Sequence, residues 1–75
     1  MVKLQELSYR EVTRRLQQLG FRFYRHGKGS HELWVRDHDG CVVPVPHHKG
    51  KALRKGTIRA IIREVGVSVQ EFMEL

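Results

Sequence analysis

Apolar residues recur at helical spacing in the N-terminal part of the chain. The apolar positions are Val12, Leu16 and Leu19. They fall on one side of a helix that we predict from about Tyr9 to Leu19, with arginine and glutamine on the other side. Ser8 and Glu11 have the spacing of a capping box at its start. Gly20 follows, where a left-handed residue commonly ends a helix.

A second helical stripe lies near the C-terminus. Its apolar positions are Ile58, Ile61, Ile62 and Val65. This spacing predicts a helix that opens at Thr57 and stops at Gly66. Ser68 and Glu71 form a second capping-box pattern, which predicts a short terminal turn that runs to Leu75.

Between the helices, three short segments are rich in aromatic or β-branched residues and are bounded by turn residues. They are Phe21–Arg25, His31–Arg36 and Cys41–Pro46. Each is predicted to be a strand. The loop His26–Ser30 joins the first two, and the turn Asp37–Gly40 joins the last two. Pro44 cannot donate to a ladder, so the third strand is expected at a sheet edge.

The predicted order is therefore α-β-β-β-α with a final turn, an α+β fold. One face of a three-stranded antiparallel sheet receives both helices, and the other face is open. We assign Leu33 and Val35 to the covered face. The residues from which the open face is expected to draw are Arg22, Tyr24, Trp34 and Arg36. Strand alternation places His31 with Leu33 and Val35, so either the strand begins after His31 or its ring reaches around the end of the sheet.

Composition narrows the class of partner. The chain has 75 residues, enough for one domain over 1–75, with a net charge of +6 and a pI of about 10.1. This charge favours a polyanionic partner such as nucleic acid. The lone Cys41 cannot form an internal disulfide, and neither a signal peptide nor a membrane span is visible, so we expect a cytoplasmic protein.

The loop before the second strand has the residues that phosphate chemistry needs. Gly27 and Gly29 allow a close backbone approach, Lys28 adds a cation and Ser30 adds a hydroxyl. The next residue, His31, is of the type that can take the proton of a 2′-hydroxyl near neutral pH. A plain hairpin turn with an ordinary strand-end histidine is the alternative.

The segment after the third strand concentrates positive charge. Its candidate phosphate or RNA-backbone ligands are His47, Lys49, Lys51, Arg54 and Lys55. Lys55 to Thr57 would present a helix N-terminus to a phosphate. His47 and His48 can be a second acid, phosphate ligands or parts of a solvated loop. No CxxC or HxxxH pair exists, so neither a metal nor another cofactor is expected. Tyr24 and Trp34, expected on the open face, would stack bases or meet a protein partner, with packing under the terminal turn as the alternative for Trp34.

The α-β-β-β-α layout with basic loops resembles the double-stranded-RNA-binding domain. Three stretches narrow the resemblance: Gly-Ser-His at 29–31, VVPVPHH at 42–48, and LRKGTIRAIIREVGVSVQEF at 53–72. Together they resemble the HicA toxin family, small mRNA interferases of type II toxin–antitoxin pairs. The resemblance covers residues 8–72.

The family resemblance implies a toxin that cleaves mRNA without a metal, with His31 as the essential acid–base residue. It also implies a HicB-type antitoxin that covers the active site. The group that protonates the leaving oxygen stays open among His47, His48, Lys28 and water. A mechanism with one histidine, in which the backbone and lysines stabilise the transition state, is equally open. A non-catalytic module that binds double-stranded RNA is the alternative function.

Overall fold

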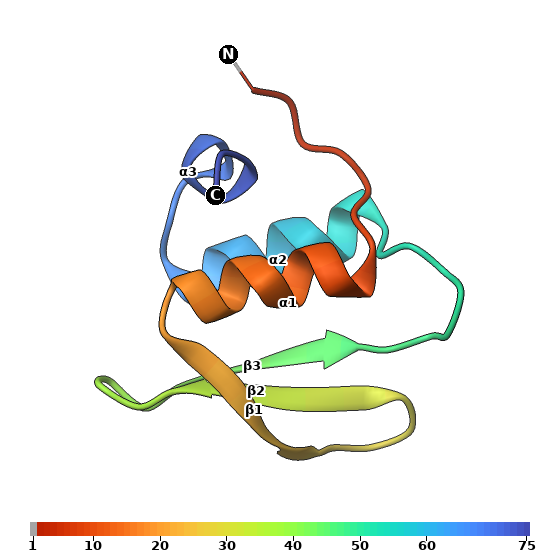
Figure 1. The fold of residues 1–75 in the computed structure, drawn as a ribbon, viewed down its shortest axis with the longest axis vertical. Coiled ribbons are helices and arrows are strands. Elements are labelled where there is room, and N and C mark those ends of the chain that lie inside the picture. Colours follow the sequence, from red (N-terminus) through yellow and green to blue (C-terminus); the bar gives the residue numbers. More distant parts are fainter. Residues whose placement is uncertain (1) are drawn as a thin grey trace.

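Six elements follow one another in the computed structural model, which describes residues 2–75 (Figure 1). They are α1 (Tyr9–Gln18), β1 (Phe21–His26), β2 (His31–Arg36), β3 (Cys41–Pro46), α2 (Lys55–Val65) and α3 (Val69–Met73). The strands form one antiparallel sheet in the order β1-β2-β3. Helices α1 and α2 lie on the same face of this sheet, so the predicted α+β fold is confirmed.

The helix ends follow the capping signals, with one exception. Ser8 and Glu11 form the predicted capping box of α1, and Ser68 and Glu71 form that of α3. Helix α2 begins at Lys55, two residues before the predicted start, and the N-cap residue Arg54 makes no side-chain cap. The sequence therefore carries no local signal for this start, because the usual N-cap residues accept a hydrogen bond through a short oxygen-bearing side chain.

The free edge of β3 offers acceptors but few donors. The backbone N–H of His47 donates to Ser30 O at 2.9 Å, which identifies the hydrogen-bonded pairs of the β2–β3 ladder. By alternation, Val42, Pro44 and Pro46 turn their backbone groups away from β2. The two prolines have no N–H, so only Val42 can donate at this edge. This composition disfavours the addition of another strand. The strand order β1-β2-β3 confirms the predicted edge position.

The assignment of faces along β2 was wrong. Trp34 is only 5% exposed and lies with Glu32 on the side of the helices, within the hydrophobic core. Leu33 and Val35 point to the uncovered side, which we call the open face. His31 shares their parity and is exposed. The ring of His31 therefore lies on the open face, and the strand still begins at His31.

Two features explain this reversal. Trp34 pairs with Phe23 in β1 and Val43 in β3, so burying this face buries the largest side chain of the strand. Val35 lies in the central strand between Arg22 and Val42, and it is 9% exposed although no helix covers it. An apolar residue in the centre of a sheet thus does not identify the covered face.

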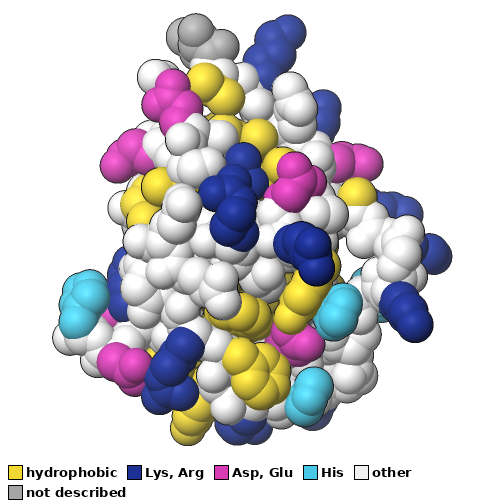
Figure 2. All heavy atoms as spheres, viewed as in Figure 1, with side chains coloured by type: hydrophobic (Ala, Val, Ile, Leu, Met, Phe, Trp, Pro, Cys, Tyr) yellow, Lys and Arg dark blue, Asp and Glu magenta, His cyan; other side chains and the backbone are white. Residues whose placement is uncertain are grey.

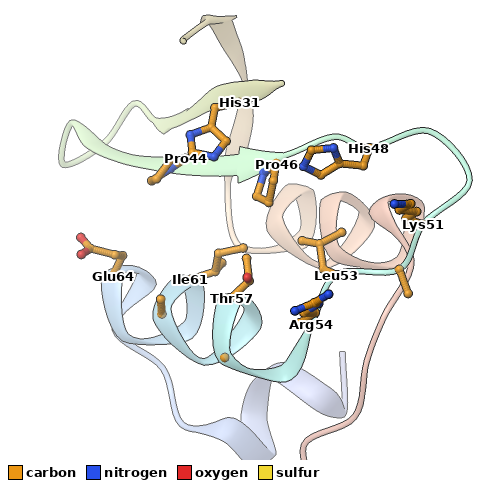
Figure 3. Close-up of a pocket in the computed structure, with 13 residues that line it drawn as sticks. His31, Pro44, Pro46, His48, Lys51, Leu53, Arg54, Thr57, Ile61 and Glu64 are labelled. Carbon is orange, nitrogen blue, oxygen red and sulfur yellow. The ribbon is translucent and has the colours of Figure 1, made fainter. Parts of the chain in front are cut away.

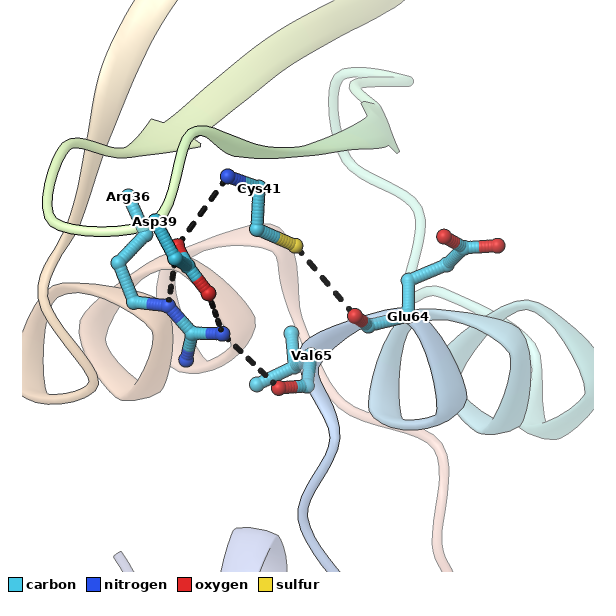
Figure 4. Close-up of polar contacts among 5 residues, drawn as sticks. All are labelled: Arg36, Asp39, Cys41, Glu64 and Val65. Carbon is cyan, nitrogen blue, oxygen red and sulfur yellow. Dashed lines mark hydrogen bonds and ion pairs between the residues drawn. The ribbon is translucent and has the colours of Figure 1, made fainter.

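Two arginines make hydrogen bonds between elements. Arg36 connects the sheet to α2, and Arg15 connects α1 to α3. Arg36, which was expected on the open face, forms a bidentate pair with Asp39 and donates to Val65 O at the end of α2 (Figure 4). The thiol of Cys41 donates to the carbonyl of Glu64 beside it. These contacts satisfy carbonyls that the last turn of α2 leaves unpaired.

The buried Arg15 donates to backbone carbonyls of α3. Its guanidinium donates to Phe72 O at 3.0 Å, to Glu11 O at 3.1 Å and to Met73 O at 3.3 Å. Burial lowers the pKa of Arg15 from its ordinary value. The C-terminal helix is thereby held against α1.

The reversed faces predict how two aromatic substitutions differ. Trp34→Ala should lower the free energy of unfolding by about 3–5 kcal/mol, the range for truncating a buried tryptophan. Tyr24→Ala should change it by no more than about 0.5 kcal/mol, because Tyr24 is 50% exposed. Urea unfolding followed by circular dichroism measures both, with Trp34→Phe as a milder variant. Equal losses at Trp34 and Tyr24 would contradict the assignment.

Candidate functional site

A tight turn delivers His31 to the start of β2. The N–H of His31 donates to Lys28 O at 3.0 Å, and the N–H of Gly27 donates to His31 O at 2.9 Å. Gly29 has φ of 59°, a left-handed conformation that other residues adopt only with strain. The N–H of Gly27 is thus engaged within the hairpin. Lys28 and Gly29, which lie at the exposed tip, are the parts of the loop free to approach a phosphate.

His31 lies across the ladder from Pro46, on the open face. Its neighbour Ser30 points to the loop that follows β3, where Ser30 Oγ lies 3.2 Å from His48 Nε2. This side-chain contact and the backbone bond from His47 to Ser30 join the two loops that carry the candidate residues. Residues 30–31 and 47–48 therefore form one local unit, although 16 positions separate them along the chain.

A groove between the free edge of β3 and helix α2 opens beside His31 (Figure 3). Its volume is about 750 Å³. The floor is mainly apolar and includes Pro44, Pro46, Leu53, Ala60 and Ile61. His31 and His48 lie together along β3 on one rim, and α2 forms the other. We call this feature the His31 groove.

Charge is distributed unevenly along the His31 groove. Lys51 and Arg54 line the end near His48, whereas Glu64 lines the opposite end (Figure 3). In the space-filling view, Lys and Arg side chains also project at the right edge of the molecule, over the loop that precedes α2 (Figure 2). The positive end of the groove is where an anion would be attracted.

The other residues predicted from sequence are more scattered. Lys49 lies with His47 around a shallower hollow next to α1. Lys28, Gly29 and Lys55 line neither cavity. The predicted set therefore divides into His31, Lys51 and Arg54 in the groove, Ser30 attached to it through His48, and the remainder outside.

His47 belongs to a different cluster, under α1. Its Nδ1 lies 3.2 Å from Glu32 Oε2, and its ring stacks on Tyr9 with 3.7 Å between centroids. Tyr9 Oη and Trp34 Nε1 both donate to Glu32 Oε1, at 2.5 Å and 3.3 Å. Glu32 is 8% exposed, so these contacts satisfy a buried carboxylate.

The cluster shifts the pKa values of Glu32 and Tyr9. Burial by itself raises the pKa of Glu32, but hydrogen bonds from Tyr9, Trp34 and His47 outweigh it, so the pKa of Glu32 is lowered from 4.5. Burial and then the hydrogen bond to Glu32 raise the pKa of Tyr9 to about 12. The cluster therefore holds an ionised glutamate and a neutral tyrosine at neutral pH.

Glu32 and its link to Tyr9 were not predicted from the sequence. The only available signal was that Glu32 shares strand parity with Trp34, and this signal was read with the wrong face buried. Glu32 connects α1, β2 and the loop after β3 through Tyr9 and His47. Its position next to His31 makes it a support for the site from the opposite face of the sheet.

Residues 2–75 hold neither a cluster of metal-ligating side chains nor a helix able to span a membrane. These residues contain no group of three or more His, Cys, Asp or Glu side chains placed to hold a metal ion. Within the same range, no helix is long and apolar enough to cross a membrane.

The hydrogen bonds from Tyr9, Trp34 and His47 to Glu32 predict a pH-dependent effect on stability. Because the folded state lowers the pKa of Glu32, its contribution is present above pH 4.5 and is lost as pH falls through the lowered value. Glu32→Gln should lower the free energy of unfolding by about 1–3 kcal/mol at pH 7, the usual range for a buried hydrogen-bonded group that loses its partner. The difference from wild type should shrink toward pH 3 in urea titrations. The exposed Glu6→Gln is the control, and a gap independent of pH would contradict the prediction.

The chain matches one protein-family model over most of its length. The family model described as "HicA toxin of bacterial toxin-antitoxin" matches residues 9–67, which include all of α1, the sheet and α2. No curated protein matches the chain. The match covers the turn that carries His31 and both rims of the His31 groove. The chain therefore belongs to the HicA toxin family of bacterial toxin–antitoxin systems.

Proposed function

We propose that this protein is the toxin of a type II pair and a metal-independent endoribonuclease that cleaves mRNA, with His31 as the essential acid–base residue. The observation that carries the proposal is the exposed His31 at the rim of a groove with cations at one end. Membership of a toxin family supports the same reading. The expected place of action is the cytoplasm, where mRNA is found.

In the proposed reaction, His31 takes the proton of a ribose 2′-hydroxyl, and the 2′-oxygen then attacks the adjacent phosphorus. General-base catalysis of this kind contributes about 10²–10⁴-fold. Further acceleration requires that the phosphate be held and that its developing charge be neutralised. Lys51 and Arg54 line the groove that His31 borders, and Lys28 lies on the turn before it, so all three are proposed phosphate ligands.

The backbone of the turn has a supporting role in the proposal. Gly29 is exposed at the tip, and a Cβ added there would meet no atom within 4 Å. A phosphate can thus approach this backbone without obstruction. Lys49 and Lys55, which lie outside the groove, are proposed to contact the RNA backbone further along the strand.

The proposed protein partner is a HicB-type antitoxin that covers the His31 groove. An acidic surface would complement the net charge of +6 and the cations at the positive end. The partner must reach the groove through side chains, a helix or a loop, because the free edge of β3 has prolines at 44 and 46 and does not accept a paired strand.

The central test replaces His31. We expect the wild-type protein to cleave single-stranded RNA in the presence of EDTA and to arrest growth when induced. His31→Ala should lose both activities by at least about 10²-fold, because the base is removed. His31 is exposed, so the variant should keep the circular dichroism spectrum and unfolding midpoint of the wild type.

The control is His38→Ala, which changes an exposed histidine in the β2–β3 turn. It should cleave and arrest growth as the wild type does. A folded His31→Ala variant that stays toxic would refute the role of His31. RNA binding without cleavage by the wild type, unaffected by His31→Ala, would instead identify a non-catalytic module for double-stranded RNA.

A second test addresses the cations of the groove. In the His31→Ala background, which prevents cleavage, Lys51→Ala with Arg54→Ala should weaken binding of single-stranded RNA. The plot of log affinity against log salt has a negative slope, and the magnitude of this slope should decrease by about 1.4, since each lost phosphate contact contributes about 0.7. Fluorescence anisotropy at several salt concentrations measures this slope.

The matched control removes the same charge elsewhere. Arg59 and Arg63 are exposed on α2 and do not line the groove. Replacing both by alanine should change the slope much less. Equal effects of the two pairs would show that RNA responds to net charge and not to the groove.

A further inference from the structure

We propose that His48 is the general acid that protonates the leaving 5′-oxygen. This inference rests on the proposed ribonuclease function and deepens it. The sequence leaves this group open among His47, His48, Lys28 and water. The geometry points to one of them.

His48 shares the rim of the His31 groove with His31. Both side chains line the same cavity, and both rings lie along β3 in Figure 3. His48 is exposed, so its ring can reach a bound RNA strand. An RNA strand along this rim would meet His31 and His48 on the same side, with Lys51 beyond His48.

A hydrogen bond orients the ring of His48. Its Nε2 lies 3.2 Å from Ser30 Oγ, and Ser30 is the residue directly before His31. In the protonated ring, Nε2–H donates to Ser30 Oγ and the transferable proton is the one on Nδ1. Ser30 is therefore a positioning residue, which holds His48 in relation to the base.

The proton balance of the step is complete with these two residues. His31 receives the proton of the 2′-hydroxyl, the 2′-oxygen bonds to phosphorus, and the bond from phosphorus to the 5′-oxygen breaks. His48 gives its Nδ1 proton to that leaving oxygen. The products are a 2′,3′-cyclic phosphate and a 5′-hydroxyl, and exchange with water restores both histidines.

The other histidine of the pair is occupied elsewhere. His47 stacks on Tyr9 and contacts the buried Glu32 on the helix side of the sheet. It does not line the His31 groove, and neither does Lys28. Of the three side chains that the sequence leaves open as the acid, His48 is the one that lines the groove with His31.

The test compares two RNA substrates that differ in the leaving group. One is a short single-stranded RNA, and the other has sulfur in place of the bridging 5′-oxygen at the cleaved bond. A thiolate leaves without a proton, so it needs no general acid. His48→Ala should be about 10²–10⁴-fold slower than the wild type on ordinary RNA and within a few-fold of it on the sulfur substrate. His31→Ala should fail on both.

The pH profile gives an independent readout. The wild-type kcat/KM should fall at high pH as the acid loses its proton, and this fall should be absent in His48→Ala. Ser30→Ala should show a smaller defect in the same direction, restored by Ser30→Thr. His38→Ala is the control histidine and should match the wild type.

Two results would overturn the assignment of His48. One is a His48→Ala variant that cleaves ordinary RNA at the wild-type rate, and the other is an equal defect on both substrates. A wild-type protein that cleaves neither substrate would refute the proposed function itself, and this inference with it. Circular dichroism of each variant confirms that the fold is kept.

Discussion

The burial of Glu32 and Trp34 on one face of the central strand is the constraint on which the site depends. Neighbouring side chains of a strand point to opposite faces, so this burial sends His31 to the open face. The carboxylate can be buried because Tyr9, Trp34 and His47 satisfy it. A buried glutamate without these donors would carry a large desolvation cost. The hydrogen bonds under α1 therefore allow this face to be buried with Trp34, and that burial turns the proposed base to the open face.

The same alternation divides the two histidines after β3. His47 turns inward to Glu32 and Tyr9, while His48 turns outward to Ser30. The loop is thus held on one side by the buried cluster and on the other by the hairpin of His31. These contacts on both sides attach the loop to its neighbours without a covalent link. It also explains why two loops distant in sequence present one surface.

Much of the fold could be predicted from local signals. The capping boxes at Ser8 and Ser68, the turn glycines and the proline in β3 each act over a few residues, and the structure has all of them where the pattern indicated. Three strands and the order of elements followed from the same signals. The start of α2 was missed because Arg54 carries no short capping side chain. Of the site, the turn that bears His31 and the basic segment before α2 could be recognised by composition.

The sequence by itself determined the periodicities, the caps, the edge position of β3 and the identity of the chemically competent residues. The tertiary structure decided which face of the sheet was covered, because both faces of β2 carry apolar side chains and only packing against α1 and α2 distinguishes them. It also decided that Ser30 meets His48 and that Glu32 meets Tyr9. Such contacts depend on distances between separate elements, and a linear pattern holds no record of those distances.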